Sequence, residues 1–220
     1  MLAMLFACIG IFGVFLFLTY YLQGTLGSSP VKTGVAFLPL VAGLASMAQV
    51  SNRFLLPKLG PKIIVPIGLL LGAVAMYMLH LVGPHTSYLS HVLPYLILLG
   101  LGFGLSLAPA FSTGTLGLQP HDAGVGSATL NAAQQVGGSI GTALLNTVAA
   151  GAATAYLVGR VASPANLRAG AVHSYTTAFL WSSIIFVAGA VVAGLVLRRG
   201  DLGALSESPV EGAEPVLAHA

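Results

Sequence analysis

Long apolar stretches alternate with short polar turns along most of the chain. Each stretch is close to or longer than the roughly 20-residue helix that crosses the hydrocarbon core of a bilayer. We therefore predict an all-α integral membrane fold. Its six transmembrane helices are expected at Leu2–Leu22, Val31–Ser51, Lys62–Val82, Val92–Leu116, Asp122–Leu157 and Ser174–Leu197.

Turns rich in glycine and proline separate these helices, because both residues interrupt regular structure. They lie at Gly24–Pro30, Pro57–Lys62, Gly83–Ser87 and Gln119–Asp122. Asp122 is also a good N-cap for the fifth helix. That helix exceeds the length of a bilayer, so we expect its far end to emerge into water. A looser segment around Arg160–His173 should follow it.

Composition identifies lipid as the solvent of this chain. Hydrophobic residues make up 56% of the sequence and charged residues only 6%, against about 25% charged residues in a typical soluble domain. The net charge of +3 is too small to indicate a nucleic acid partner. Cys8 is best interpreted as a small apolar side chain. We expect a transmembrane domain over residues 1–199 and a disordered cytoplasmic tail over 200–220.

Basic residues suggest the orientation in a cell (plasma) membrane. An even number of helices leaves both termini on one side of the bilayer. That side would carry five basic residues, Arg53, Lys58, Lys62, Arg198 and Arg199, against three on the other, Lys32, Arg160 and Arg168. Because basic loops favour the inner side, both termini are predicted to be cytoplasmic.

The first helix resembles a signal peptide only in its hydrophobicity. Met1–Leu22 lacks a basic beginning and a cleavage site of small residues, so we interpret it as a retained membrane helix. The sequence starts abruptly within an apolar run, which suggests a truncated chain or a piece of a longer one. Tyr20 and Tyr21, at the helix end, are expected in the interfacial aromatic belt.

The fifth helix carries the most informative pattern. At about 100° per residue, a polar stripe lies within about 80° of its circumference, and its members are Asn131, Gln135, Gly138, Thr142 and Asn146. Unpaired amides are costly in lipid, so this stripe must meet other helices or a water-filled cavity. Hydrogen bonding between helices alone remains an open alternative to a solvent-filled pathway.

Small residues form two further patterns. Gly126, Gly137 and Gly141 share another face of the fifth helix, which predicts close approach of a second helix. The fourth helix contains Gly100–Gly104 with glycine at every second position, followed by Pro109, which predicts a flexible or kinked helix. The same glycines lack the strand–helix context of a dinucleotide-binding loop.

Other chemistry finds little support in the sequence, and no enzyme activity, metal or cofactor is expected. Gly137–Gly141 matches the G-x-S-x-G pattern, but a nucleophile elbow needs a strand-to-helix turn and this segment lies inside a helix. His80, His85 and His91 are interpreted as scattered histidines near helix ends. No ionisable residue lies near the middle of a predicted helix, although coupling sites usually require one. Energy-coupling groups are therefore expected outside this chain.

Three segments resemble the major facilitator superfamily, in its fourteen-span drug:proton antiporter branch (the EmrB/QacA type). They are Tyr21–Pro30 with the following Phe37–Pro39, the basic loop Arg53–Lys62, and Gly124–Gly141. The resemblance covers about residues 1–199 and implies the C-terminal domain, built as two inverted three-helix repeats. Gln134 departs from the branch, where arginine is frequent, and the N-terminal half with its coupling acids is missing.

The resemblance implies export of hydrophobic or cationic compounds by alternating access. The leading hypothesis is the C-terminal half of a proton-coupled efflux transporter. Its substrate pathway would be lined by Gln23, Gln49, Phe111, Ser112, Asn131 and Gln135. The alternative is a non-transporting membrane binding or scaffold protein from a truncated or split transporter gene.

Overall fold

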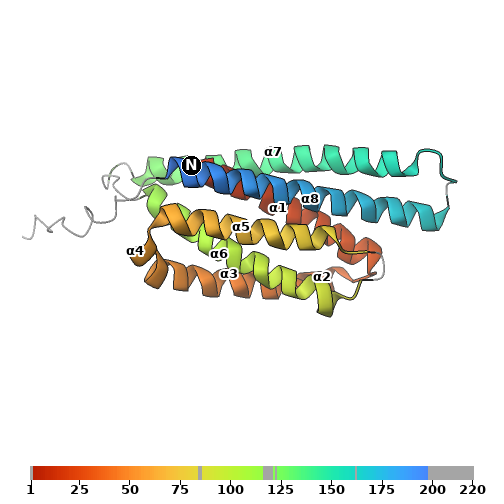
Figure 1. Ribbon diagram of the computed structural model, residues 1–220, viewed down its shortest axis with the longest axis horizontal. Helices are drawn as coiled ribbons and strands as arrows, with labels where there is room; N and C mark the ends of the chain where they lie inside the picture. Colours follow the sequence, from red (N-terminus) through yellow and green to blue (C-terminus); the bar gives the residue numbers. More distant parts are fainter. Residues whose placement is uncertain (1, 84–85, 116–120, 122, 162, 198–220) are drawn as a thin grey trace, which may run out of the picture.

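Six long helical segments run side by side along the length of the protein (Figure 1). The computed structural model describes residues 2–83, 86–115, 121, 123–161 and 163–197. The α-helices are α1 (Leu2–Tyr20), α2 (Pro30–Ala36), α3 (Leu38–Val50), α4 (Leu56–Leu59), α5 (Pro61–His80), α6 (Leu93–Thr115), α7 (Ala123–Leu157) and α8 (Pro164–Val196). Wider π-helical turns are η1 (Tyr21–Thr25), η2 (Ser51–Leu55) and η3 (Tyr88–Val92).

The described part of the chain contains six segments that are long and apolar enough to cross a bilayer. They are Leu5–Thr25, Pro30–Leu59, Pro61–His80, Tyr88–Ser112, Gly124–Leu157 and Pro164–Val196. The predicted all-α fold with six transmembrane helices is confirmed. With 35 residues, α7 is about 52 Å long at 1.5 Å per residue. Together with α8 it extends beyond the other helices, at the end of the bundle away from the N-terminus (Figure 1).

The first helix of each half of the chain packs against helices of the other half. In the first half α1, α3 and α5 are the three long helices, and in the second half α6, α7 and α8. Helix α1 packs on α7 and α8, while α6 packs on α3 and α5. The third helices, α5 and α8, pack on each other. This reciprocal pairing is what two inverted three-helix repeats produce.

Helix α6 lies close to its two neighbours because its glycines have no side chains. A Cβ atom added at Gly104 would lie 2.6 Å from the carbonyl oxygen of Leu44 in α3. One added at Gly102 would lie 2.7 Å from the carbonyl oxygen of Gly68 in α5. Such close backbone approach increases van der Waals contact where lipid supplies no hydrophobic driving force. The flexible or kinked helix that the sequence indicates stays a prediction, and the role that the structure gives these glycines is close packing.

A fully buried phenylalanine joins the two halves at the centre. Phe186 of α8 packs edge to face on Phe103 of α6, with ring centroids 5.7 Å apart. Its ring also occupies the space beside Gly10 of α1 and Gly72 of α5. One turn earlier, the Ser183 hydroxyl donates a 2.8 Å hydrogen bond to the Ala73 carbonyl of α5. The centre of the bundle is therefore both apolar and hydrogen-bonded.

The predicted looser segment over Arg160–His173 is wrong from residue 164 onward, because α8 already begins at Pro164. The Ser163 hydroxyl accepts a 3.2 Å hydrogen bond from the Asn166 N–H, and proline occupies the first helical position. Both features favour a helix start. The sequence prediction followed hydrophobicity, which is low in this first part of the helix.

The predicted basic loop over Arg53–Lys62 is also mostly helical. The chain continues through η2 and α4 to Leu59 and turns only at Gly60, whose φ of +73° favours glycine. Gly60 alone thus separates α4 from α5.

The prediction that Tyr21 lies in the interfacial aromatic belt is wrong. Its side chain is buried, and its hydroxyl donates a 2.8 Å hydrogen bond to the Gly83 carbonyl beyond α5. Its neighbour Tyr20 is 47% exposed. The expected cap at Asp122, the helix end at Leu116 and the tail over 200–220 lie outside the described residues.

Replacing Gly102 with alanine should destabilise the protein. The new methyl group would meet backbone atoms of α5, which cannot rotate away, and overpacking of this kind costs about 1–3 kcal/mol. Gly151→Ala in α7 is the matched control, because nothing lies within 4 Å of its added Cβ. Thermal unfolding of both purified variants in detergent measures the difference. Equal melting temperatures would contradict the packing role of Gly102.

Candidate functional site

Helix α7 lies at the edge of the bundle and presents polar side chains outward. Its main neighbours are α1 and α8, and Asn131, Gln135 and Asn146 are exposed. Hydroxyl groups on this helix bind their own backbone, since Ser139 donates to Gln135 O and Thr147 to Ala143 O, both at 2.8 Å. The three amides, in contrast, make no hydrogen bond within the described residues. They can bind water or an external partner.

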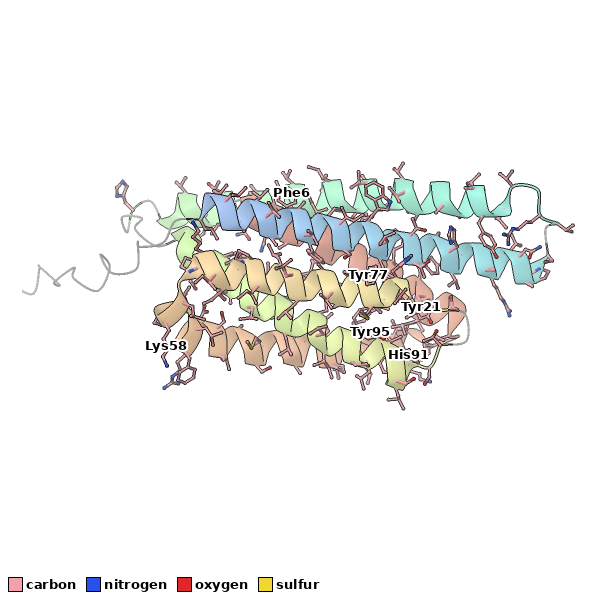
Figure 2. The ribbon with its side chains drawn as sticks, in the orientation of Figure 1. Phe6, Tyr21, Lys58, Tyr77, His91 and Tyr95 are labelled. Carbon is pink, nitrogen blue, oxygen red and sulfur yellow. The ribbon has the colours of Figure 1, made fainter. Side chains whose placement is uncertain are left out.

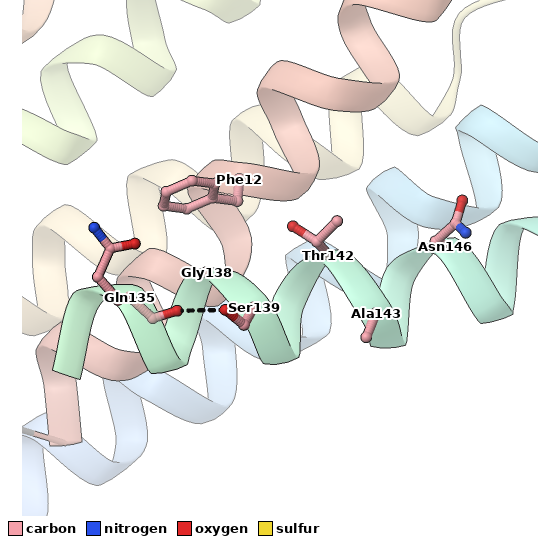
Figure 3. Close-up of a pocket in the computed structure, with 7 residues that line it drawn as sticks. All are labelled: Phe12, Gln135, Gly138, Ser139, Thr142, Ala143 and Asn146. Atoms are coloured by element: carbon pink, nitrogen blue, oxygen red, sulfur yellow. Dashed lines mark hydrogen bonds between the residues drawn. The ribbon is translucent and has the colours of Figure 1, made fainter. Parts of the chain in front are cut away.

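An open groove of about 400 Å³ runs along this polar stripe and reaches α1 (Figure 3). It is lined by Phe12, Gln135, Gly138, Ser139, Thr142, Ala143 and Asn146. The spacing of Gln135, Thr142 and Asn146 places them on one side of the helix, as the sequence predicted. The groove lining contains no ionisable side chain.

The wall of the groove opposite the amides is an aromatic ring. Phe12 of α1 lies over Gly138, and a Cβ added at Gly138 would come within 2.7 Å of that ring (Figure 3). The glycine therefore permits Phe12 to lie across α7 between Gln135 and Thr142. An exposed aromatic face beside unpaired amides can stack a flat apolar group and bind its polar atoms by hydrogen bonds.

The neighbouring glycine face of α7 lies against α1. Cβ atoms added at Gly137 would lie 2.8 Å from Leu5 O, and at Gly141 2.6 Å from the Ile9 Cα atom. Gly126, nearer the start of the helix, is half-buried. Close approach at Gly137 and Gly141 sets the separation of α1 and α7, and so the width of the groove beside them.

The six predicted pathway residues do not gather in this groove. Gln135 lines it, and Asn131 lies exposed one turn earlier on α7. Gln23 is exposed in η1, and Gln49 is exposed in α3. Phe111 and Ser112 are half-buried near the end of α6, where the Ser112 hydroxyl donates to Ala108 O at 3.0 Å.

Sequence reasoning omitted Phe12 from the pathway, although helical spacing puts Phe12 and Phe15 on one face of the first helix. An aromatic residue on that face was a usable signal, but its position over Gly138 depends on how α1 crosses α7. Ser139 and Ala143 gave no signal, because their side chains lie beside the polar stripe.

The segments considered for other chemistry have simple structural roles. Gly137–Gly141 lies inside α7, away from any strand-to-helix turn. His80 Nδ1 lies 2.8 Å from Thr176 O, and His91 contacts the Ser90 hydroxyl. His85 lies outside the described residues. Searching the described part of the chain for three clustered His, Cys, Asp or Glu residues finds no metal-binding group.

Cysteines introduced into the groove should react with a water-soluble maleimide. In a Cys8→Ala background, we expect Gln135→Cys and Asn146→Cys in the purified chain to label readily, because thiolate formation needs water. Leu145→Cys, fully buried on the same helix, is the control and should label slowly. Equal labelling at the three positions would show that the groove is not a distinct aqueous surface.

Comparison with known proteins agrees with this architecture. A family model described as Major Facilitator Superfamily matches residues 1–142. The puromycin resistance protein of Streptomyces alboniger is 47% identical over 86% of this chain and 38% of its own length. The cephamycin export protein of Amycolatopsis lactamdurans is 32% identical over 95% of this chain and 41% of its own length.

A multidrug resistance protein B homologue of Mycobacterium tuberculosis is 36% identical over 64% of this chain and 26% of its own length. The chain thus spans between about a quarter and two fifths of these relatives. The match to the family model covers more than half of the chain, and the six-helix architecture is consistent with it. The chain belongs to the Major Facilitator Superfamily.

Proposed function

We propose that this chain is the C-terminal half of a proton-coupled efflux transporter that exports drugs or hydrophobic metabolites by alternating access. The groove between α1 and α7 carries this proposal. It combines an exposed aromatic ring with amides that have no partner within the described residues, on a chain otherwise built for lipid. Such a surface suits a substrate pathway.

The missing partner is an N-terminal transporter half. An amide without a hydrogen bond costs roughly 1–3 kcal/mol when it is buried away from water, so the outward stripe of α7 is unsuited to lipid. Water in a cavity between two halves would satisfy Asn131, Gln135 and Asn146. The greater length of the relatives supports this arrangement.

The substrate is a small hydrophobic or cationic molecule. Stacking on Phe12 and hydrogen bonds to Gln135 and Asn146 suit an apolar body with a few polar atoms. The groove lining contains no basic side chain, so no positive charge there would repel a cationic substrate. Puromycin, cephamycin and tetracenomycin C appear in the names of relatives, and antibiotics of that size are reasonable first compounds to test.

Proton coupling would reside in the partner half. The ionisable residues of this sequence lie toward the ends of its helices or in the turns and tail. Moving a proton across the bilayer needs a titratable group within it. This half would therefore contribute substrate contacts and helix packing to the exchange.

Both termini are proposed to face the cytoplasm of a plasma membrane protein. Arg53 of η2, Lys58 of α4 and Lys62 of α5 lie near the end of the bundle that carries the N-terminus (Figure 1). The opposite end carries Lys32, Arg160 and Arg168. The excess of basic residues supports an inner position for the first of these ends.

A second candidate function is that of a non-transporting membrane binding or scaffold protein, because the exposed amides of α7 could also bind another membrane protein. The reading frame upstream of the Met1 codon separates the two. About eight further helices in frame would support the transporter, and a separate promoter and start site would support the second candidate.

Substituting alanine for Asn131 or Gln135 in the complete transporter should lower efflux about tenfold, within the range for one lost hydrogen bond of about 1–3 kcal/mol. Thr147→Ala is the matched control, because its hydroxyl binds only Ala143 O of its own helix. Accumulation of a fluorescent substrate in cells gives the measurement. Wild-type accumulation in both amide variants would remove them from the pathway.

Cysteine labelling in intact cells should report the proposed orientation. Val161→Cys, in the turn between α7 and α8, is expected to react with an impermeant maleimide added outside. Leu59→Cys, before Gly60, should react only after lysis. The reverse pattern would place the termini outside the cell.

A further inference from the structure

A second groove lies at the other end of the bundle from the N-terminus, where α8 passes the end of α1. It has a volume of about 250 Å³ and is lined by Gly24, Thr25, Leu167, Arg168, Ala171 and Tyr175. The α8 residues recur at three- and four-residue intervals, so they form one face of the helix. This groove is separate from the one along α7.

The polar groups of this groove make no hydrogen bond to one another. Arg168, Tyr175 and Thr25 make no side-chain hydrogen bond or ion pair among the described residues. A Cβ added at Gly24 would lie 3.9 Å from the Tyr175 hydroxyl, so that hydroxyl reaches the π-helical turn. One guanidinium and two hydroxyl groups thus border the same small space.

The charge of this end of the bundle is wholly positive. The acidic residues of the sequence are Asp122, Asp201, Glu207, Glu211 and Glu214. None lies in the described residues 21–33, 80–83, 86–92, 154–161 or 163–176, which lie at this end. Arg160, the other arginine here, lies 3.7 Å from the centre of the Tyr156 ring. The described residues include no acidic side chain, so none of them supplies an anion to Arg168.

The groove lies at the end of a segment that is long and apolar enough to cross a bilayer, and exposed aromatic side chains border it. Thr25 is the last residue of the first membrane-spanning segment. The Tyr175 ring centroid is 6.2 Å from that of Tyr20 and 6.4 Å from that of Phe17. Tyr20 is half exposed on the outer surface of α1. Phe17 is buried, so the aromatic strip on the surface beside the groove consists of the partly exposed Tyr175 and the exposed Tyr20.

We propose that this groove binds the phosphate of an anionic phospholipid, with the acyl chains along the aromatic strip. A guanidinium binds phosphate through paired hydrogen bonds, and the Tyr175 and Thr25 hydroxyls can donate to the remaining oxygens. No carboxylate is present for the ammonium of a zwitterionic lipid, so an anionic headgroup is selected.

Binding of dioctanoyl phosphatidylglycerol to the purified chain, measured by calorimetry in a non-ionic detergent, tests this site. Arg168→Gln should weaken binding about fivefold, which corresponds to the roughly 1 kcal/mol that one basic side chain contributes near an anionic surface. Dioctanoyl phosphatidylcholine should bind more weakly than phosphatidylglycerol. Ala171→Leu, which fills the groove and keeps every charge, should also weaken binding.

Arg160→Gln is the matched control, because it removes a charge from the same end of the bundle but not from the groove. Equal losses in the two arginine variants would show general surface attraction and overturn the site. Glycerol phosphate binding as tightly as the lipid would replace the lipid with a soluble anion. Unchanged affinity in Ala171→Leu would exclude the groove.

Discussion

The close approach of helix backbones at glycine is the constraint on which this structure depends. In lipid, apolar side chains gain little by turning inward, so helices associate through packing and hydrogen bonds. Gly102 and Gly104 of α6 bring its backbone against α5 and α3, and Gly137 and Gly141 of α7 do the same against α1. The two halves of the chain correspond in these contacts. In each case the first long helix of one half packs on the second long helix of the other, α1 on α7 and α6 on α3.

Reciprocal pairing leaves α3 and α7 at the two edges of the bundle and α5 with α8 in contact between the halves (Figure 1). Large side chains can therefore fill the centre, where Phe186 meets Phe103. The ends of the bundle carry side chains with polar atoms. Figure 2 shows four of them, Tyr21, Lys58, His91 and Tyr95, toward the ends of the spans. The hydrogen bond from Tyr21 to Gly83 O ties the end of α1 to the segment after α5.

Because α7 lies at an edge of the bundle, the amides of its polar stripe are exposed and do not pair with neighbouring helices. Amides in the centre could have bonded to neighbouring helices, which was the open structural alternative. Gln135 and Asn146 instead line a groove and make no hydrogen bond within the described residues. Gly141 fixes α1 beside them, and Gly138 allows Phe12 to complete the wall. Packing and recognition thus use adjacent faces of one helix.

Hydrophobic periodicity and punctuation by glycine and proline determined the six membrane helices, their order and the polar stripe of α7, because lipid requires long apolar segments with satisfied backbones. Hydrophobicity alone placed the start of α8 ten residues late and proposed a loop where the chain stays helical to Leu59. Which helices meet, the burial of Tyr21, and the meeting of Phe12 with Gly138 depended on tertiary structure. These features join residues distant in the chain, and no local pattern encodes the crossing of two helices.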